Sequence, residues 1–410
     1  MRAIRSGELA DRAFVRLVAK VEARDRPWLH ELVYGTLRLR GRLDYILGNF
    51  VKRDTARLDA DVLDILRLSA YQLLEMDSVP AYAAVSQAVE LTKTSKARSA
   101  SGLVNGVLQS LRREQASLVK DRRAWASHPD WLLDRWIARF GFDEAMALAD
   151  ANNRRPSLFV RPVGIGLSKA ISQLQERGIN AEEVAADALR IESGASVMDV
   201  LDAIPAIVQD PAAGLVAKFA ALDGVVADLC AAPGGKAIAM ADRLTSGFVL
   251  ASDVSAGRMQ RLTENLMRIG QLPVHVAVAD ARFPIVASCD GVLLDAPCTG
   301  TGTFMRHPDG KWRIQPADLQ ALVEMQAQLL DAAAPIVKRG GTLVYSTCSI
   351  EPEENETQVL NFLERHNTFR LASPSSWYEP TQLNERGMLM MLPHRHGFDG
   401  AFAARLERVA

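Results

Sequence analysis

Several features that define whole classes of protein are missing from this 410-residue sequence. No run of apolar residues approaches the ~20 that a membrane-spanning helix needs. The opening segment, MRAIRSGELADRAF, lacks the apolar stretch of a signal peptide. Internal repeats and low-complexity tracts are absent, and the 48% hydrophobic and 24% charged residues are typical of globular proteins. We therefore expect a cytoplasmic protein with no membrane partner.

Cysteine is scarce, and two common nucleotide-binding signatures are absent. The four cysteines, Cys230, Cys289, Cys298 and Cys348, are 59, 9 and 50 residues apart. This spacing matches neither a disulfide scaffold nor the paired ligands of a zinc site, so we expect reduced thiols and no metal. Neither G-x-x-x-x-G-K-S/T nor G-x-G-x-x-G occurs, which argues against nucleoside triphosphatases and dehydrogenases.

The length exceeds the roughly 250 residues that one hydrophobic core usually supports, so the chain should form several domains. Residues 1–120 repeat apolar positions at helical spacing and predict an all-helical bundle. Residues 121–205 combine helical stretches with strand-like segments such as SLFVRPV and ALRIES, and predict a small mixed α+β connecting domain. Residues 206–410 alternate short apolar runs with helices, which is typical of a doubly wound α/β fold.

The short apolar runs of this last region are its expected strands. Bounded by Gly and Asp, they are typical of parallel strands buried on both faces. The runs are GVVADLCAA, SGFVLASDVS, VHVAVADA, CDGVLLDAP and GTLVYSTCS. Ligands of such sheets bind beyond the carboxyl ends of the strands, so we expect the functional site there.

Charge is distributed unevenly along the chain, although the formal net charge is only -1. Residues 1–125 carry 22 Lys and Arg against 15 Asp and Glu, which gives +7 and leaves -8 for the remainder. Arg38, Arg40 and Arg42 fall together in RLRGRLDYIL. This pattern favours RNA or another polyanion as a partner, and equally an ordinary solvated helical surface.

A glycine turn follows the first of these strands. In VVADLCAAPGGK, Gly234 and Gly235 would let a ligand approach the backbone, where N–H groups at a helix start favour an anionic group. Successive strands are each followed by a carboxylate, namely Asp228, Asp253, Asp280 and Asp295. Asp253 comes 25 residues after Asp228, close to the ~20 at which an acidic residue meets ribose hydroxyls.

A mouth lined with acids suits a positively charged nucleoside. S-adenosylmethionine has this character, because its sulfonium and amino groups are cationic. The alternative is that the aspartates cap helices, which would explain any single one more readily than all four.

Two cysteines follow expected strands of the same sheet and so open onto one cleft. They are Cys298, after DAP, and Cys348, at the end of LVYSTC, whereas Cys230 and Cys289 are interpreted as small buried side chains. A thiolate beside a methyl donor suggests methylation at carbon 5 of a pyrimidine, because thiolate addition to carbon 6 makes carbon 5 nucleophilic. Such an enzyme takes its base from an unpaired loop or out of a stack. The spacing leaves open which cysteine is the nucleophile.

Four segments carry a resemblance to a known family. DLCAAPGGK, DAPCTGTG, RHPDGKW and VYSTCSIEPEENE resemble motifs of the RNA cytosine-5 methyltransferase family. The first 120 residues, with ELVYGTLRLRGRLDYIL, resemble the NusB-type domain of its bacterial Sun or RsmB branch, which methylates 16S ribosomal RNA. VQDPAAG at 208–214 and HGFDGAFAARL near the end also match, so the resemblance covers nearly the whole chain.

The resemblance implies a Rossmann-like methyltransferase domain, S-adenosylmethionine as cofactor, and 16S ribosomal RNA or an assembling small subunit as partner. It also implies that Cys348 is the nucleophile, that Cys298 releases the product and that Asp295 is catalytic. The implied cofactor-binding residues are Cys230, Ala231, Ala232, Pro233, Gly234, Gly235, Lys236, Asp253, Asp280 and Asp295. We expect a monomer.

Other functions remain as alternatives. An inactive NusB-like RNA-binding platform is disfavoured by the retention of both cysteines and all four acids, whereas methylation of another RNA, such as tRNA, stays open. A DNA cytosine methyltransferase would lack the TCS cysteine or carry a large target-recognition insertion, and the chain has neither property. Met305 and Gly310 depart from the family pattern, where an arginine and a bulky apolar residue are usual, so RNA contacts near this loop are not carried over.

Overall fold

Two compact units make up the computed structural model, which describes residues 1–51, 54–115, 118–192, 194–374 and 378–410. The first unit comprises Met1–Arg155 together with Phe304–Arg313, and the second comprises Pro156–Thr303 together with Ile314–Ala410. Among the described residues, no helix is both long enough and apolar enough to cross a membrane.

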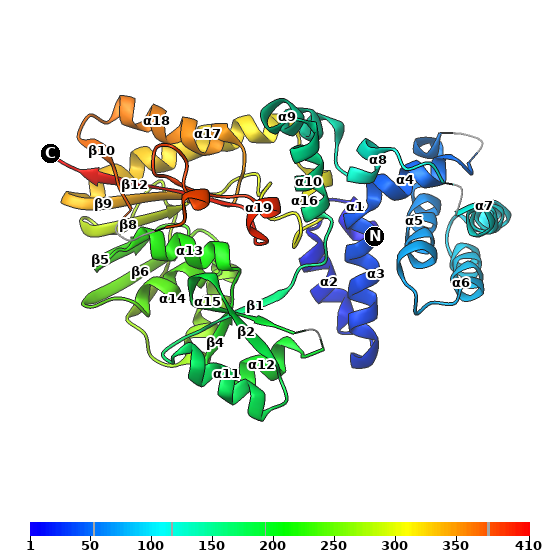
Figure 1. The fold of residues 1–410 in the computed structure, drawn as a ribbon, viewed down its shortest axis with the longest axis horizontal. Helices are drawn as coiled ribbons and strands as arrows, with labels where there is room; N and C mark the ends of the chain where they lie inside the picture. The colour runs from blue at the N-terminus through cyan, green and yellow to red at the C-terminus, as the bar shows by residue number, and fades with distance from the viewer. Residues whose placement is uncertain (52–53, 116–117, 193, 375–377) are drawn as a thin grey trace. The chain divides into compact units, whose positions relative to one another are not determined.

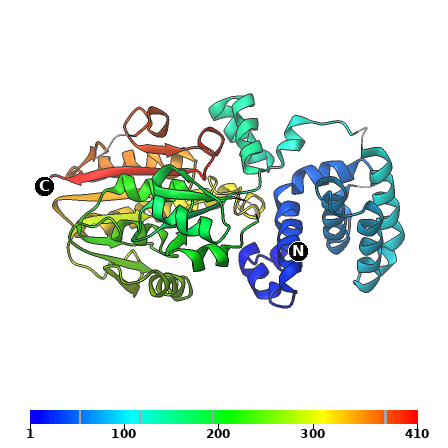
Figure 2. The ribbon, with the colours of Figure 1, turned by 60° about the horizontal axis from the view of Figure 1, so that its bottom comes forward.

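The first unit is helical, as its apolar spacing predicts. On α5 (Ala60–Glu75), the side chains of Val62, Ile65 and Leu66 are buried. Ile65 and Leu66 come three and four residues after Val62, so the three side chains lie on one face of the helix. Asp59 caps this helix, because its carboxylate accepts hydrogen bonds from the N–H groups of Asp61 and Val62. Figure 2 shows these helices, coloured blue to cyan, from a second direction. The others are α1 (Arg2–Arg5), α2 (Ala10–Val18), α3 (Arg26–Arg38), α4 (Arg40–Gly48), α6 (Ala81–Thr94), α7 (Ser101–Glu114), α8 (Arg122–Ala126), α9 (Asp130–Phe140), α10 (Phe142–Asn152) and α16 (Gly310–Arg313).

A segment from the distant RHPDGKW motif belongs to this helical unit. The side chain of Lys311 is 0% exposed, and its Nζ donates to the carbonyl oxygens of Arg38 at 2.9 Å and Ser127 at 3.2 Å. These carbonyls lie at the carboxyl ends of α3 and α8, where C=O groups have no partner within their own helix. Burial, followed by the charges of Arg38 and Arg42, lowers the pKa of Lys311, so the lysine serves here as a hydrogen-bond donor. The indole of Trp312 donates to the carbonyl of Leu37 at 2.7 Å. The segment therefore donates hydrogen bonds to carbonyl groups at the ends of helices that the first 155 residues form.

The arginine cluster at 38, 40 and 42 is packed inside the first unit. Arg38 is 4% exposed and donates to the carbonyl of Met305, Arg40 stacks on the ring of Trp312, and Arg42 donates to the carbonyl of Trp125. Burial lowers the pKa of each guanidinium. Both expectations, an RNA-facing patch and a solvated surface, are therefore wrong for Arg38; Arg40 and Arg42 are half-buried, and their contact with RNA stays a prediction. Sequence spacing alone could not reveal that the partner helix ends and aromatic rings come from later segments.

We expect Lys311→Met to lower the free energy of unfolding by about 2 kcal/mol, because the carbonyl of Ser127 and the side-chain oxygen of Asn153 lose this donor. The loss stays moderate, since the carbonyl of Arg38 retains a hydrogen bond from Ser127 Oγ. Urea unfolding followed by far-ultraviolet circular dichroism measures this change. Lys93→Met is the matched control, because Lys93 is an exposed lysine that pairs with its helix neighbour Glu90. Equal destabilisation by the two variants would contradict the capping role.

The second unit begins with a small antiparallel sheet in the order β2-β3-β1-β4. Val160, Leu189 and Ala206 form its core with Ala170 and Leu174 of the crossing helix α11. The elements of this part are β1 (Leu158–Pro162), α11 (Leu167–Glu176), β2 (Ala181–Val184), β3 (Ala188–Ile191), α12 (Val197–Ala203) and β4 (Ala206–Val208).

A larger sheet follows, in the order β10-β12-β9-β8-β5-β6-β7, with β11 paired to β12. The five strands predicted from the sequence, β5 to β9, pair in parallel. The three strands near the carboxyl terminus pair antiparallel. The strands are β5 (Gly224–Asp228), β6 (Gly247–Asp253), β7 (Val274–Val278), β8 (Cys289–Asp295), β9 (Val337–Thr347), β10 (Phe369–Ala372), β11 (Leu389–Met391) and β12 (Ala401–Arg408).

Helices cover both faces of this sheet, as Figure 1 shows, with α17 and α18 on one face and α13 to α15 on the other. Two separate hydrophobic clusters lie between these layers, which explains why the central strands are apolar. The expectation of burial on both faces is wrong for β7, which lies at the edge of the sheet and has Val278 59% exposed. The doubly wound, Rossmann-like prediction is thus confirmed. The helices are α13 (Pro211–Ala220), α14 (Gly235–Ala241), α15 (Ala256–Ile269), α17 (Pro316–Ala333), α18 (Glu356–Arg365) and the short α19 (Pro393–His396).

The boundaries expected from the sequence, at 120 and 205, remain predictions. The structure groups α8 to α10 with the helical unit, and the sheet of β1 to β4 with the second unit. This grouping follows the hydrogen bonds of Ser127 to Gly41 and to Arg38, which tie the end of α8 to α3 and α4.

Candidate functional site

The predicted site residues gather at the carboxyl ends of the parallel strands. Strand β5 lies between β6 and β8 in the sheet. After β5 the chain forms β6 and β7 on one side of it, and then β8 and β9 on the other side. A crevice forms at such a reversal of strand order, where ligands of open α/β sheets bind. Asp228, Asp253 and Asp295 are the last residues of β5, β6 and β8, and Asp280 follows β7 by two residues.

The turn from Cys230 to Lys236 joins β5 to α14. The N–H of Ala231 donates to the carbonyl of Ser252 on the neighbouring strand at 2.9 Å. Gly234 has a φ of +104°, and a Cβ there would lie 2.2 Å from Leu262. Its lack of a side chain is therefore required by backbone conformation and by packing against α15. Close approach of a ligand to Gly234, the reason expected from the sequence, is not needed to explain this glycine.

Asp228 is the most deeply buried of the four acids predicted at the strand ends. Its side chain is 1% exposed, and neither carboxyl oxygen has a hydrogen-bond partner in the described part of the chain. Burial, followed by the nearby charge of Asp295, raises the pKa of Asp228 to about 8. Gln209 is 6% exposed, and both polar atoms of its side chain also lack partners among the described residues. Unsatisfied polar groups of this kind are typical of a site that awaits a ligand.

Asp253 and Asp280 are already engaged by arginines. Asp253 is 3% exposed, accepts hydrogen bonds from the N–H groups of Ala232 and Ser255, and pairs with Arg258 at 2.9 Å. Asp280 is more open and pairs with Arg282 at 2.6 Å. The backbone contact with Ala232 brings Asp253 against the glycine turn. The contacts of Asp280 in the described residues stay within its own loop.

Lys236 and Asp295 form the ion pair at the centre of the site. Lys236 Nζ lies 2.7 Å from Asp295 Oδ2, and the hydroxyl of Ser346 donates to the other carboxylate oxygen at 2.7 Å. Burial of Lys236 favours its neutral form, but the charge and the hydrogen bond of Asp295 outweigh this effect and raise the pKa of the lysine. The site therefore keeps a cation in a low-dielectric environment.

The two cysteines that follow β8 and β9 come together. Cys298 Sγ lies 3.3 Å from Cys348 Sγ, and both side chains are half-buried. The hydrogen bond between the sulfurs lowers the pKa of Cys348 and raises that of Cys298 well above its ordinary value, while burial opposes ionisation of both. Among the nearby charges, Asp295 disfavours and Lys236 favours the Cys348 thiolate, while Glu354 disfavours ionisation of Cys298. Within the pair, Cys348 is accordingly the thiol that ionises more readily.

A polar network around the cysteines escaped the sequence reasoning. Glu354 and Gln326 hold the turn of Cys298 through hydrogen bonds. The hydroxyl groups of Thr301 and Ser349, the residue after Cys348, share a hydrogen bond of 3.2 Å. The TCS segment is also tied by Gly302, whose N–H donates to the carbonyl of Cys348 at 3.0 Å. Glu354 lies within EPEENE, part of a segment that resembles a family motif, but the sequence predicted no role for this residue.

The remaining cysteines behave differently. Cys289 is 0% exposed inside a hydrophobic cluster, and burial raises its pKa to about 11, which confirms the interpretation as a buried side chain. Cys230 is half-buried beside the acids, and burial and Asp228 raise its pKa. Neither environment activates a thiol.

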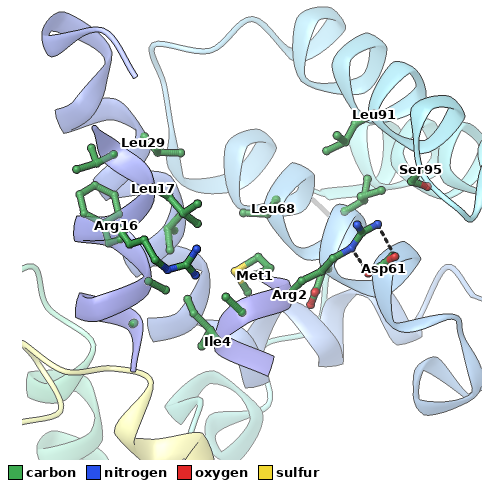
Figure 3. A pocket seen from close by; sticks show the side chains of 18 of the residues that line it. Met1, Arg2, Ile4, Arg16, Leu17, Leu29, Asp61, Leu68, Leu91 and Ser95 are labelled. Carbon is green, nitrogen blue, oxygen red and sulfur yellow. Dashed lines mark hydrogen bonds and ion pairs between the residues drawn. The ribbon is translucent and has the colours of Figure 1, made fainter. Parts of the chain in front are cut away.

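A large apolar pocket lies elsewhere, in the first unit. It has a volume of about 650 Å³ and is lined by α1, α2, α3 and α5, with Leu17, Leu29 and Leu68 among its walls. The ion pair of Arg2 with Asp61 borders it (Figure 3). None of the predicted site residues lines this pocket.

Comparisons with known proteins agree with this architecture. Residues 221–407 match the family model described as 16S rRNA methyltransferase RsmB/F, residues 3–113 the NusB family, and residues 128–198 the RsmF/B-like ferredoxin-like domain. The chain is 36% identical to the ribosomal RNA small subunit methyltransferase B of Erwinia tasmaniensis, over 94% of this chain and 91% of that protein. It is 35% identical to a probable ribosomal RNA small subunit methyltransferase B of Synechocystis, with the same coverage.

Solved structures show the same fold. The structure of PH0851 has a TM-score of 0.79 at 28% identity and covers 95% of this chain and 91% of that one. A structure of NSun6 from Pyrococcus horikoshii with SFG has a TM-score of 0.60 at 21% identity, over 69% of this chain and 98% of that one. By its curated relatives and its domain matches, the chain belongs to the ribosomal RNA small subunit methyltransferase B family.

Proposed function

We propose that this protein transfers a methyl group from S-adenosylmethionine to carbon 5 of a cytosine in 16S ribosomal RNA, through a covalent bond to Cys348. The observation that carries the proposal is the pair of sulfurs 3.3 Å apart beside the ion pair of Lys236 and Asp295. Its test is to isolate the RNA adduct and to identify the cysteine that forms it.

The residues at the strand ends fit this cofactor. The three acids Asp228, Asp253 and Asp295 outnumber the two nearby cations, Lys236 and Arg258, and Asp228 is buried without a partner among the described residues, which suits a ligand with cationic amino and sulfonium groups. The unpartnered side chain of Gln209 offers a further hydrogen bond near the glycine turn. We assign cofactor binding to these residues, to the turn from Cys230 to Lys236, and to Asp280. S-adenosylmethionine, when bound, supplies an electrophilic methyl group.

The chain's own residues account for the covalent steps on the base. The Cys348 thiolate adds to carbon 6 of cytosine, which gives carbon 5 the electron density of an enamine. Lys236 stabilises this thiolate, and Asp295 keeps the lysine charged and oriented. After methylation, loss of the carbon 5 proton expels the Cys348 sulfur and restores the aromatic ring. Cys298, which holds its proton beside this sulfur, is placed to assist that release.

Two alternatives are separated by specific features. An inactive RNA-binding platform would not need a lysine held charged beside a thiolate, and a different RNA, such as tRNA, would use the same cysteines. Methylation assays with undermethylated small-subunit RNA, the assembled particle and tRNA distinguish these substrates. A cytoplasmic location and a monomeric state remain predictions.

We expect Asp253→Ala to weaken S-adenosylmethionine binding by about 1–3 kcal/mol, because two ribose hydroxyls would lose a charged acceptor. Isothermal titration calorimetry measures the affinity directly. Asp223→Ala is the matched control, since Asp223 also accepts backbone N–H groups, from Thr245 and Ser246, but lies before β5 at the opposite end of the strand.

Arg258→Ala sharpens this test, because Arg258 pairs with both oxygens of Asp253. If ribose hydroxyls replace the arginine, removal of Arg258 leaves the affinity unchanged or raises it. Unchanged affinity in Asp253→Ala, with a lower melting temperature, would instead mean that Asp253 only orders the backbone of Ala232 and Ser255.

A further inference from the structure

The buried carboxylate of Glu354 holds the turn that carries Cys298 in place, and we call its hydrogen bonds with Thr299 and Gln326 the clasp. The side chain of Glu354 is 0% exposed, and its Oε1 accepts hydrogen bonds from the backbone N–H of Thr299 and from the side-chain amide of Gln326, both at 2.9 Å. The hydroxyl of Thr299 donates to the other carboxylate oxygen. The amide of Gln326 also donates to the carbonyl of Pro297 at 2.9 Å. The residues on both sides of Cys298 are therefore fixed by one polar cluster.

The chemistry of this cluster is unusual for a structural brace. The partners of Glu354 among the described residues are hydroxyl and amide groups rather than cations. Burial raises the pKa of the Glu354 carboxyl, although Ser349, Thr299 and Gln326 offset part of that effect. A neutral glutamine would hold the same turn at a lower desolvation cost. The retained acid therefore points to a use of its charge.

That charge lies on the Cys298 side of the sulfur pair. Glu354 disfavours a negative charge on Cys298. On the other side of the pair, Lys236 favours a negative charge on Cys348, whereas Asp295 and Asp399 disfavour it. The two sulfurs share a hydrogen bond, so small electrostatic differences decide which of them keeps the proton. The charge of Glu354 therefore adds to the preference for the proton on Cys298 that the hydrogen bond between the sulfurs sets.

We propose that Glu354 is a positioning residue that fixes the turn from Pro297 to Thr299 and keeps the shared proton of the cysteine pair on Cys298. This role rests on the proposed function, since it assigns the nucleophile to Cys348 and the protonated thiol to Cys298. It is distinct from contact with RNA or cofactor, because Glu354 acts only through Thr299, Gln326 and the charge that it places near Cys298.

The test measures the reactivity of each thiol without RNA or cofactor. Iodoacetamide labels the full-length protein across a pH series, and peptide mass spectrometry gives the rate at Cys298 and at Cys348. We expect the wild type to react first at Cys348. Glu354→Gln keeps the shape but removes the charge, and should lower the Cys348-to-Cys298 rate ratio by about tenfold, which equals one pKa unit. Methyl transfer should show a lower kcat with an unchanged KM for RNA.

Glu356→Gln is the matched control for charge. Glu356 lies two residues further along, and its carboxylate accepts from Asn384 and Arg386 rather than from the cysteine turn. It should leave the rate ratio unchanged. Thr299→Ala removes one donor of the clasp but not the charge, so it should lower kcat while the rate ratio keeps its wild-type value.

A wild-type rate ratio and pH profile in a folded Glu354→Gln protein would overturn the proposal. If Glu354→Gln does not fold, Gln326→Leu tests the clasp from its other end, and an unchanged kcat there would overturn it as well. Failure of the proposed function is distinguishable, because it would appear as absent methyl transfer in the wild type. The alkylation ratio would still be measurable in that case.

Discussion

Cys348→Ala is expected to abolish methyl transfer and to form no covalent adduct with RNA, even when S-adenosylmethionine is present. The variant lacks the sulfur that would add to carbon 6, so carbon 5 never becomes nucleophilic. We expect turnover to fall by about 10⁴-fold or more, the scale typical of losing a nucleophile. Single-turnover assays with radiolabelled methyl groups measure this loss.

Cys298→Ala should behave in the opposite way on a denaturing gel. Attack by Cys348 and methyl transfer still occur, but release of the product slows, so RNA remains attached to the protein as a shifted, RNase-sensitive band. Because the hydrogen bond with Cys298 also lowers the pKa of Cys348, the initial attack should be slower than in the wild type. Cys289→Ala is the matched control, since that thiol is buried in a hydrophobic cluster away from the sulfur pair.

Two outcomes would change the mechanism. An adduct that forms with Cys348→Ala and disappears with Cys298→Ala would reverse the roles of the cysteines and favour a DNA-type mechanism. Full activity of both single variants, with no adduct from either, would remove covalent catalysis. A normal melting temperature for each variant ensures that the result reports chemistry rather than folding.

The sequence predicted the second unit well because its signals are local. The apolar strands and the acids or cysteines after them occur in continuous segments, and parallel pairing then brings Asp228, Asp295 and the region of Cys348 to one edge. The pairing of Lys236 with Asp295 was within reach of the same argument, since both residues follow strands that are neighbours in the sheet.

The sequence was less informative where contacts join distant segments. The arginines at 38, 40 and 42 look like a surface patch because nothing near them in sequence shows that Met305, Trp312 and Trp125 bury them. Met305 is itself 7% exposed, so this departure from the family pattern is a packed side chain of the helical unit. Deleting residues 1–120 would therefore expose the buried face of residues 304–313 and disturb more than RNA binding.

The cluster around Glu354 shows the same limit at the site. Gln326 lies 28 residues from Glu354, on the helix between β8 and β9, and no periodicity links the two. A buried, hydrogen-bonded acid is recognisable only when the burial of its surroundings is known. The cysteine pair was predicted to share a cleft, but the order of proton affinity within the pair required the positions of Lys236 and Glu354.

Asp228→Asn is expected to stabilise the protein while it weakens cofactor binding. The folded-state pKa of Asp228, about 8, is raised above the ~3.9 of an unfolded aspartate, so ionisation of this buried group opposes folding. The penalty is absent below about pH 4 and grows as pH rises toward 8. Because pH 7 lies about three units above the pKa of the unfolded-state aspartate, the penalty at pH 7 is at most roughly 4 kcal/mol. The asparagine side chain of the variant cannot ionise, so the free energy of unfolding of the variant does not decrease in this way as pH rises.

Urea unfolding at pH 4.5 and pH 7.5 measures the effect, with Asp290→Asn as the control of opposite sign. The hydrogen bond from Lys338 lowers the pKa of Asp290, so the charged form supports folding and its removal should destabilise the protein at neutral pH. A wild-type pH dependence in Asp228→Asn would mean that Asp228 is not the source of the penalty.

The same group should make cofactor binding proton-coupled. At pH 7 most of the free protein carries a proton on Asp228, and a cationic ligand beside it favours the carboxylate, so S-adenosylmethionine binding should release a proton. Calorimetry in buffers of different ionisation enthalpy measures this release, which should vanish in Asp228→Asn. Binding of equal affinity and equal proton release in both proteins would place the cationic groups of the cofactor away from Asp228, nearer Asp253 or Asp295. The unpartnered oxygens of Asp228 would then need another donor, because a buried acceptor without one costs about 1–3 kcal/mol.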